Sequence, residues 1–443
     1  MKKSKFIKST VILLLGGLIT KLLGMVIRIV MSRNLGSVGM GIYMMIMPTF
    51  STFIALSQFG FPVAISKLVA ENKYNNKNMV FSSLIIALFI NILIIFLLTF
   101  SSHFVANNLL HESRTYYGLI AISFVLPFIS VSSILRGYFF GKEKMLPHVL
   151  SNAIEDITRL ILLSLFIPLF LLKGIEFAVM FTVLSNIASE LVSILVFFFF
   201  LPKNFKINKN DFIINKNIKK VLKISIPTTM SRLIGSFGYF LEPIIITSTL
   251  LKIGYSSDFI VSEYGIITGY IMPLILLPSF FTNAISQALI PTISYSYSNN
   301  HKTYVKNKIK QAIFISLLIG IPVTIVFTFF PEIPLKIIYN TNLGINYLKV
   351  IAPISLLFYI QSPLSSSLQA MGKAKEAMHG TFLSMIIRVS ILFIFSHLKI
   401  GLWSLIIATG CNMVFTTLYD LKHIKKELRL NWTPKVGQFI NSF

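Results

Sequence analysis

Twelve apolar stretches, each long enough to cross a lipid bilayer as a helix, follow one another along the 443 residues of this chain. A spanning helix needs about 20 mostly apolar residues, and only structures that satisfy their backbone hydrogen bonds internally are stable in hydrocarbon. The stretches therefore predict a bundle of membrane-spanning helices. They run at about 6–31, 41–66, 79–101, 116–139, 147–172 and 177–201, and then at about 222–250, 259–291, 310–330, 346–370, 378–397 and 400–419.

The composition favours an all-α integral membrane protein. Hydrophobic residues make up 55% of the chain and charged residues only 12%, whereas soluble domains carry about 25% charged residues. The apolar run after the basic start continues past Lys21 and Arg28 to Met31, which is too long for a cleaved signal peptide, so we expect a retained first helix. Stretch 259–291 contains three prolines and is expected to be tilted or broken.

Lysine and arginine residues set the expected orientation. If the N-terminus lies in the cytoplasm, 28 of the 40 Lys and Arg residues fall in cytoplasmic segments and 7 in outer loops. Cytoplasmic loops of membrane proteins are enriched in these residues, so we expect both termini in the cytoplasm and the protein in the cell membrane. The net charge of +25 does not indicate a nucleic-acid partner, because the charges lie in short loops between apolar runs.

A sequence repeat divides the chain into halves. Gly41–Pro62 opens GIYMMIMP and closes ALSQFGFP, and Gly265–Pro291 opens GIITGYIMP and closes AISQALIP. Such a repeat indicates a duplicated unit, in which Pro48 and Pro273 are equivalent. Six helices with both ends in the cytoplasm make parallel repeats, related by an axis along the membrane normal.

The expected domains follow from this repeat. They are a six-helix bundle over 1–201, a basic cytoplasmic linker over 202–220, a second six-helix bundle over 221–420 and a basic cytoplasmic tail over 421–443. Inside-positive topology explains the basic linker, and binding to anionic lipid head groups is the alternative.

Nine ionisable residues lie at mid-membrane depth in the predicted helices, where a charge is costly and commonly functional. Lys21 and Arg28 are seven residues apart, so they share one face of the first helix with Gly17 and Gly24. Glycines there allow a ligand or another backbone to approach closely. We expect this cationic stripe to face a cavity, with snorkelling as the alternative for Arg28. The other seven residues are Glu155, Asp156, Arg159, Glu190, Arg232, Glu242 and Arg388.

Several of these charges are candidates for coupling. Glu155 and Arg159 have the i,i+4 spacing of an intrahelical pair, which suits a structural role as well as a functional one. Glu242 lies at about the depth of Arg28, which predicts a charge pair across a cavity. Arg159 and Arg388 occupy the fifth helices of the two halves.

Motifs of enzymes and metal sites are missing from the sequence. None of the seven histidines has a metal-ligand spacing such as HExxH, no GxSxG or P-loop pattern occurs, and Cys411 is the only cysteine. No soluble domain is present to hold an active site. We therefore expect no enzyme activity, no cofactor and no metal site.

Three segments carry a family resemblance: LLGMVIRIVMSRNLGSVGMGIY (Leu22–Tyr43), LRGYFFGKEKMLPHVLSNAIEDITRL (Leu135–Leu160) and YGIITGYIMPLILLP (Tyr264–Pro278). They resemble the stage V sporulation protein B and polysaccharide-transporter branch of the MOP exporter superfamily. The resemblance implies two six-helix bundles that form a V around a central cavity, with alternating access. It also implies a substrate class, undecaprenyl-pyrophosphate-linked saccharides such as peptidoglycan precursors, moved from the inner to the outer leaflet.

The resemblance extends to single residues. Related lipid II flippases hold the pyrophosphate with arginines of the first helix, and Arg28 lies in a matching motif while Lys21 is a looser match. Relatives commonly have fourteen helices, and the last two help to form a groove for the lipid tail in the lipid II flippases. This chain ends soon after its twelfth stretch, so the resemblance covers the two-bundle core and not that groove.

The hypothesis from the sequence is a monomeric flippase for a lipid-linked saccharide. Cavity cations neutralise the pyrophosphate, the tail stays among the membrane lipids, and rocking of one bundle exposes the site outward. The cations are Lys21, Arg28 and Arg232, and the residues for coupling to an unidentified ion are Glu155, Arg159, Glu242 and Arg388.

Two alternatives stay open. A cation-coupled multidrug exporter of the same superfamily would use cavity carboxylates to bind H⁺ or Na⁺ and a cationic drug. A membrane-embedded sugar or acyl transferase would need a paired carboxylate near a leaflet surface, and Glu155 with Asp156 is the candidate pair.

Overall fold

The computed structural model describes residues 2–71, 75–202 and 218–428. These ranges are helical apart from short turns, and they contain no β-strand. The expected all-α fold is confirmed. The predicted linker 202–220 lies mostly outside the described residues, and so does most of the predicted tail 421–443.

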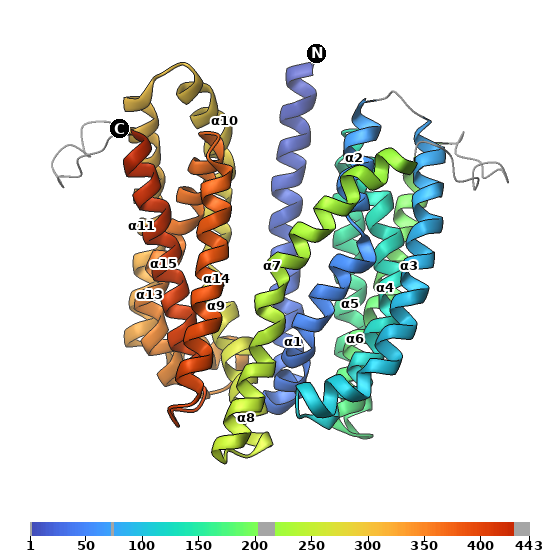
Figure 1. The fold of residues 1–443 in the computed structure, drawn as a ribbon, viewed down its shortest axis with the longest axis vertical. Coiled ribbons are helices and arrows are strands. Elements are labelled where there is room, and N and C mark those ends of the chain that lie inside the picture. The colour runs from blue at the N-terminus through green and yellow to red at the C-terminus, as the bar shows by residue number, and fades with distance from the viewer. Residues whose placement is uncertain (1, 72–74, 203–217, 429–443) are drawn as a thin grey trace. The chain divides into compact units, whose positions relative to one another are not determined.

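Figure 1 shows the helices, which are numbered in the order of the chain. The first half contains α1 (Lys2–Gln58), α2 (Phe61–Glu71), α3 (Asn76–Phe104), α4 (Tyr116–Gly141), α5 (Leu146–Leu171) and α6 (Ile175–Phe200). The second half contains α7 (Ile218–Ile253), α8 (Ser257–Gly265), α9 (Met272–Leu276), α10 (Ser279–Ser298), α11 (Lys302–Phe329), α12 (Glu332–Pro334), α13 (Ile345–Ala370), α14 (Ala374–Ser396) and α15 (Trp403–Leu428). Short 3₁₀ or π-helical segments lie at η1 (Val105–Leu109), η2 (Ser113–Thr115), η4 (Ile266–Ile271) and η5 (Leu335–Tyr339).

α1 joins the first two predicted stretches into one kinked helix. The kink is at Gly36, whose φ of 66° and ψ of −173° are not helical. Glycine adopts a positive φ readily because it has no Cβ. Helical structure continues directly on both sides of the kink. The gap between the first two predicted stretches, which contains Arg33, was therefore wrongly expected to be an outer loop, and the chain changes direction there without one.

The predicted break in stretch 259–291 is confirmed. α8 passes into the π-helical segment η4, the short α9 ends at Leu276, and α10 begins at Ser279 after Pro278. Proline has no backbone N–H to donate, which favours a helix start at this point.

Ten helices of the described chain are long and apolar enough to span a membrane. The count differs from twelve for two reasons. α1 contains two predicted stretches in one helix of 57 residues, and α5, with 26 residues, carries Glu155, Asp156 and Arg159 and is not among the ten. The first difference arises from the glycine kink in α1 and the second from the charged turn in α5. The order of the helices along the chain is as predicted.

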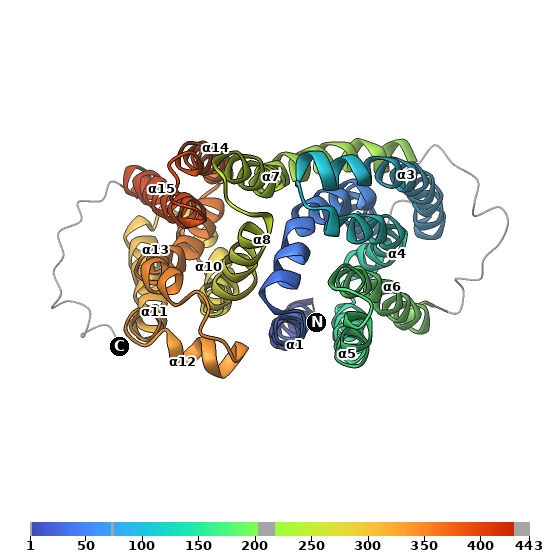
Figure 2. The same cartoon turned by 90° about the horizontal axis from the view of Figure 1, so that it is seen from below.

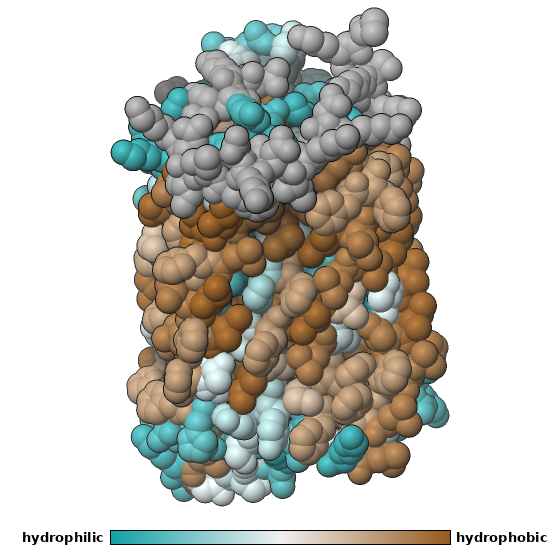
Figure 3. Space-filling view, turned by 90° about the vertical axis from the view of Figure 1, so that its right-hand side faces the viewer, coloured by the Kyte–Doolittle hydropathy of each residue, from teal (hydrophilic) through white to brown (hydrophobic). Residues whose placement is uncertain are grey.

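Apolar side chains cover the outside of the helices. Phe89, Phe96 and Phe100 of α3 are 60–81% exposed. On the face shown in Figure 3, apolar residues form a broad band, and hydrophilic residues gather at its lower end. Hydrocarbon stabilises such a band, whereas water does not.

Contacts between helices divide the chain into two compact units. The first holds Met1–Leu274, Glu332–Tyr347 and Val389–Ile406, and the second holds Ile275–Pro331, Leu348–Arg388 and Ile407–Phe443. In the first unit, α4, α5 and α6 lie side by side (Figure 2), and α7 and α8 pack against α1. The division into bundles over 1–201 and 221–420 stays a prediction.

The repeated Ser-Gln motif makes comparable contacts in each unit. Ser57 is fully buried, and it donates a hydrogen bond to the Leu126 carbonyl of α4 at 3.0 Å. Ser286 is buried as well, and its hydroxyl is 2.8 Å from that of Ser362 on α13. α4 and α13 are the fourth predicted helices of the two halves, so these contacts support the duplication.

Candidate functional site

The predicted cationic stripe lies along the first part of α1. Lys21 is exposed and Arg28 is half-buried. A Cβ added at Gly17 or Gly24 would have no atom within 4 Å, whereas one at the neighbouring Gly16 would lie 2.4 Å from Val149 of α5. The stripe is therefore on an open face of α1, beside the face that packs against α5.

Arg28 and Arg159 converge on one side chain. Both guanidinium groups act electrostatically on the phenol of Tyr43, which lies further along α1. Arg28 also donates a long hydrogen bond, 3.5 Å, to the backbone carbonyl of Thr268. Two cations from different helices thus approach one region of the first unit.

Tyr339 is a second phenol near Arg28. Burial raises the pKa of Tyr339 to about 12, although Arg28 acts on it in the opposite direction. Its ring stacks on that of Tyr270, with 5.2 Å between centroids. The hydroxyl of Tyr339 therefore keeps its proton at neutral pH and is a hydrogen-bond donor beside Arg28.

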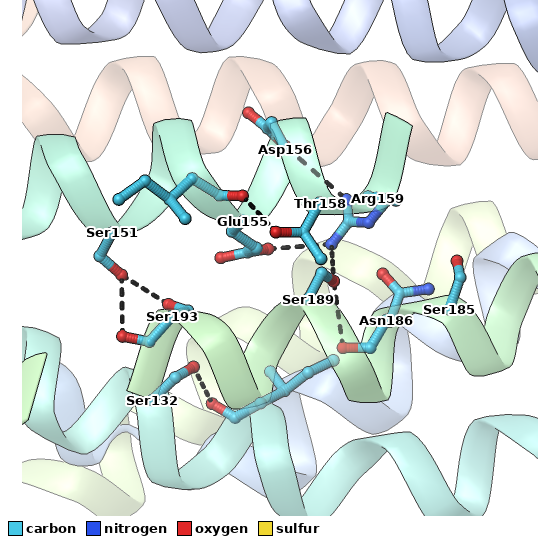
Figure 4. A network of polar contacts seen from close by, with 12 residues as sticks. Ser132, Ser151, Glu155, Asp156, Thr158, Arg159, Ser185, Asn186, Ser189 and Ser193 are labelled. Carbon is cyan, nitrogen blue, oxygen red and sulfur yellow. Dashed lines mark hydrogen bonds and ion pairs between the residues drawn. The ribbon is translucent and has the colours of Figure 1, made fainter. Parts of the chain in front are cut away.

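Arg159 belongs to a polar network between α4, α5 and α6 (Figure 4). Arg159 Nη2 lies 2.9 Å from Glu155 Oε1, which confirms the predicted i,i+4 pair. Arg136 of α4 lies 3.6 Å from the other oxygen of Glu155, and Asp156 lies 3.9 Å from Arg159. Ser189 of α6 accepts a hydrogen bond from Arg159 at 3.4 Å, so three helices contribute to one charged cluster.

The other predicted site residues make contacts outside the Arg159 network. Arg232 of α7 donates to the Gln58 side chain at 2.7 Å. Glu242 is buried and accepts a hydrogen bond from the Tyr264 hydroxyl at 3.2 Å. Arg388 is half-buried on α14, in the second unit.

α1 and α8 cross at two glycines of the repeat. A Cβ at Gly41 would lie 1.9 Å from the carbonyl oxygen of Val261, and one at Gly265 would lie 2.2 Å from that of Ser37. Ser262 donates a hydrogen bond to Ser37 at 2.8 Å. We call Ser37, Gly41, Ser262 and Gly265 the α1–α8 crossing. Only glycine permits this approach of the two backbones.

An ion-pair cluster lies at the start of α8. Arg114 contacts Glu112 at 2.7 Å and Asp258 at 2.7 Å, and Ser257 donates to Glu112 at 2.8 Å. Burial pushes the pKa of Glu112 upward, but hydrogen bonds from Arg114 and Ser257 outweigh it and hold that pKa below its usual range.

Comparisons with known proteins agree with this geometry. The family model described as "Polysaccharide biosynthesis protein" matches residues 6–297. Stage V sporulation protein B of Bacillus subtilis is 36% identical over 456 residues, which cover 100% of this chain and 88% of that protein. The chain belongs to the polysaccharide biosynthesis protein family.

Further similarities place this family member in the MOP superfamily. The MatE family model matches residues 236–394. The inward-facing structure of a multidrug resistance MATE family transporter of the MOP superfamily shares the fold, with a TM-score of 0.72, 18% identity and coverage of 93% of this chain and 95% of that one. The lipid II flippase MurJ of Bacillus subtilis is 24% identical over 96% of this chain and 83% of its own length. The protein is a multi-pass membrane transporter and not an enzyme.

Sequence reasoning missed part of the site of this transporter. Arg136 was assigned to a cytoplasmic segment, and its contact with Glu155 depends on the packing of α4 against α5. Glu190 was recognised as intramembrane but given no role. Tyr43 carries no charge and gave no signal.

Among the described residues, no group of three His, Cys, Asp or Glu side chains is arranged so that it could hold a metal ion. The candidate site is instead a set of cations and phenols with hydrogen-bonding hydroxyl groups. Such a set suits an anionic ligand.

Proposed function

We propose that this transporter flips a saccharide linked to undecaprenyl pyrophosphate, a cell-envelope or spore peptidoglycan precursor, from the inner to the outer leaflet by alternating access. The observation that carries the proposal is that Arg28 and Arg159, on different helices, both influence Tyr43 electrostatically, next to the open face that bears Lys21. A pyrophosphate is a compact multivalent anion, and charge-assisted hydrogen bonds to its oxygens are among the stronger ones.

The energetics of α1 favour a ligand for these cations. On insertion scales, a charge at the centre of a spanning helix costs about 2.5–3.5 kcal/mol. Among the described residues, Arg28 makes one long hydrogen bond to the backbone carbonyl of Thr268, which neutralises no charge. An anion bound between Arg28, Lys21 and Arg159 offsets this cost, and Arg232 extends the cationic surface along α7.

The named relatives support the substrate class. One is a sporulation protein and another a lipid II flippase. Both names are consistent with a substrate that carries a saccharide on a lipid pyrophosphate.

Alternating access assigns a role to the α1–α8 crossing. In the proposed topology both termini and the linker 202–220 are cytoplasmic, so the crossing and the Glu112 cluster lie toward the outer surface. Release outward requires α1 and α8 to separate there, which breaks the hydrogen bond between Ser37 and Ser262 and the ion pair between Arg114 and Asp258. We propose a monomer as the working unit, with Glu155, Arg159, Glu242 and Arg388 serving the coupling.

The test is a flipping assay in proteoliposomes with lipid-linked saccharides of different head groups. Arg28→Ala should abolish flipping while the protein still inserts and folds. Arg28→Lys should reduce it in part, because lysine keeps the charge and loses the bidentate fork. Lys173→Ala, in the short turn between α5 and α6, is the control for loss of a cation and should flip normally. Normal flipping by Arg28→Ala at equal expression contradicts the proposed site.

A cation-coupled multidrug exporter is the second candidate. The MatE match over 236–394 and the buried Glu242 with its Tyr264 partner favour it. It predicts the reverse ranking, in which Glu242→Gln abolishes export of a cationic drug and Arg28→Ala has little effect.

A further inference from the structure

The network between α4, α5 and α6 contains an excess of acidic groups. Its cations are Arg136 and Arg159, and its carboxyl groups belong to Glu155, Asp156 and Glu190. Fully ionised, this set carries one net negative charge. An unpaired charge buried among helices costs more free energy than a neutral set of paired ions.

Glu190 is the carboxyl group without a cation of its own. Glu155 has one arginine on each oxygen, at 2.9 and 3.6 Å, and Asp156 lies 3.9 Å from Arg159. Glu190 is 6% exposed, and it accepts a hydrogen bond from the neutral hydroxyl of Ser132. Its Oε2 atom is buried and has no hydrogen-bond partner within the described residues.

The groups around Glu190 come from each helix that packs on α6. Arg136 of α4 acts on it electrostatically, as do Glu155 and Arg159 of α5. α1 also packs on α6 and contributes the phenol of Tyr43, which Arg159 and Arg28 both influence. Asp156 and His148 of α5, both influenced by Arg136, are further titratable groups of the network.

We propose that Glu190 is a proton-binding site, with the proton on Oε2, and that it takes up a proton when an anion binds at Arg28 and Arg159. The second part rests on the proposed function, because it needs an anionic substrate. With the proton bound, the network has two positive and two negative charges. Without it, the surplus negative charge opposes an anion approaching Arg159.

Reciprocal linkage makes this coupling obligatory. An anion beside Arg159 reduces the positive potential that Glu190 experiences, which favours its protonated form. Protonation of Glu190 must then strengthen anion binding by the same factor. The proton therefore compensates part of the charge that the substrate brings into the protein.

The proton site is tested first without ligand. Full-length protein in lipid nanodiscs is titrated while the infrared C=O band of protonated carboxylic acids is recorded. A band that persists well above pH 5 should disappear in Glu190→Gln, whose neutral amide has the shape of the protonated acid. It should remain in Glu176→Gln, a control in the first turn of the same helix. If Glu190→Gln leaves the band unchanged, the assignment of the proton to Glu190 is overturned.

The linkage is tested with farnesyl pyrophosphate as the probe. Calorimetric titrations in buffers of different ionisation enthalpy give the number of protons exchanged on binding. Since pyrophosphate itself exchanges protons, the readout is the difference between parent and Glu190→Gln, and we expect the parent to take up as much as one additional proton per ligand. In the pH range where Glu190 is ionised in the free protein, parent affinity should fall with rising pH by up to about tenfold per unit relative to Glu190→Gln.

Two results would count against the linkage or the proposals beneath it. Equal proton uptake in parent and Glu190→Gln overturns the linkage. Absence of probe binding to the parent contradicts the proposed function and the linkage together, while the infrared band still decides the proton site. If Glu190→Gln fails to fold, the same measurements on Glu190→Asp decide, because a carboxyl moved by one methylene must shift the band and its titration if the site is correct.

Discussion

The α1–α8 crossing gives the sharpest test of how this transporter opens. Gly41→Ala would place a Cβ 1.9 Å from the carbonyl oxygen of Val261, so the helices must separate by roughly 1.5 Å to restore a normal contact. Overpacking of this kind costs about 1–3 kcal/mol. If α1 and α8 touch in one transport state and separate in the other, the whole cost falls on the state with the crossing.

The expected consequence is a shift between conformations. A differential cost of about 1–3 kcal/mol changes the ratio of two states by about 5- to 150-fold. Crosslinking measures it directly, because the hydroxyl oxygens of Ser37 and Ser262 are 2.8 Å apart. Cysteines at both positions, in a chain whose Cys411 has been replaced, should form a disulfide rapidly on mild oxidation. Gly41→Ala should slow that crosslinking by the factor above.

The control is Gly235→Ala on α7, where an added Cβ would meet no atom within 4 Å. It tests the general effect of a methyl group and of higher helix propensity in a membrane helix, and it should crosslink at the parent rate. Equal crosslinking rates for Gly41→Ala and its parent, at equal expression, would refute the close backbone contact at Gly41.

Two further predictions concern the outer surface and the topology. The ion pair with Arg114 lowers the pKa of Glu112, so the stability it contributes should be present above the pKa of the unfolded carboxyl and vanish as the pH falls through the folded pKa. Glu112→Gln should therefore lower the thermal unfolding temperature at pH 7 and not in strong acid. An equal loss at both pH values would contradict the ion-pair explanation. Cysteines introduced one at a time at Asn208 and at the exposed Leu343, in a chain without its native cysteine, should differ in intact cells, with an impermeant thiol reagent labelling only Leu343→Cys; labelling of both would overturn the topology.

The succession of helices was predictable from the sequence because hydrocarbon imposes one requirement on every span. Apolar runs of sufficient length identify helices whatever their partners are. The prolines near Pro278 indicated the break before α10 for an equally local reason. Gly36 was harder, because a glycine permits a positive φ without requiring it, and the expected loop around Arg33 was replaced by a kink.

The site was predictable only where its contacts are local. Glu155 and Arg159 are one helical turn apart, so their pairing followed from spacing. The contact of Arg136 with Glu155 joins α4 to α5, and no spacing rule connects them. The proximity of Arg28 and Arg159 to Tyr43 likewise depends on how α1 packs against α5.

Gly41 and Gly265 link the repeat to the mechanism in a way that neither residue suggests alone. They open the two copies of the repeat, and in the first unit their backbones touch. Gly41 lies seven residues before Pro48 and Gly265 eight before Pro273, so nearly equivalent positions of the two copies contact each other, as they do near the axis of an isologous interface. A rocking motion of duplicated bundles changes the distance between equivalent positions, and at a glycine pair in backbone contact that distance can only increase. Under the proposed alternating access, the crossing would act as a stop at one end of the motion, and a side chain at either glycine would move that stop.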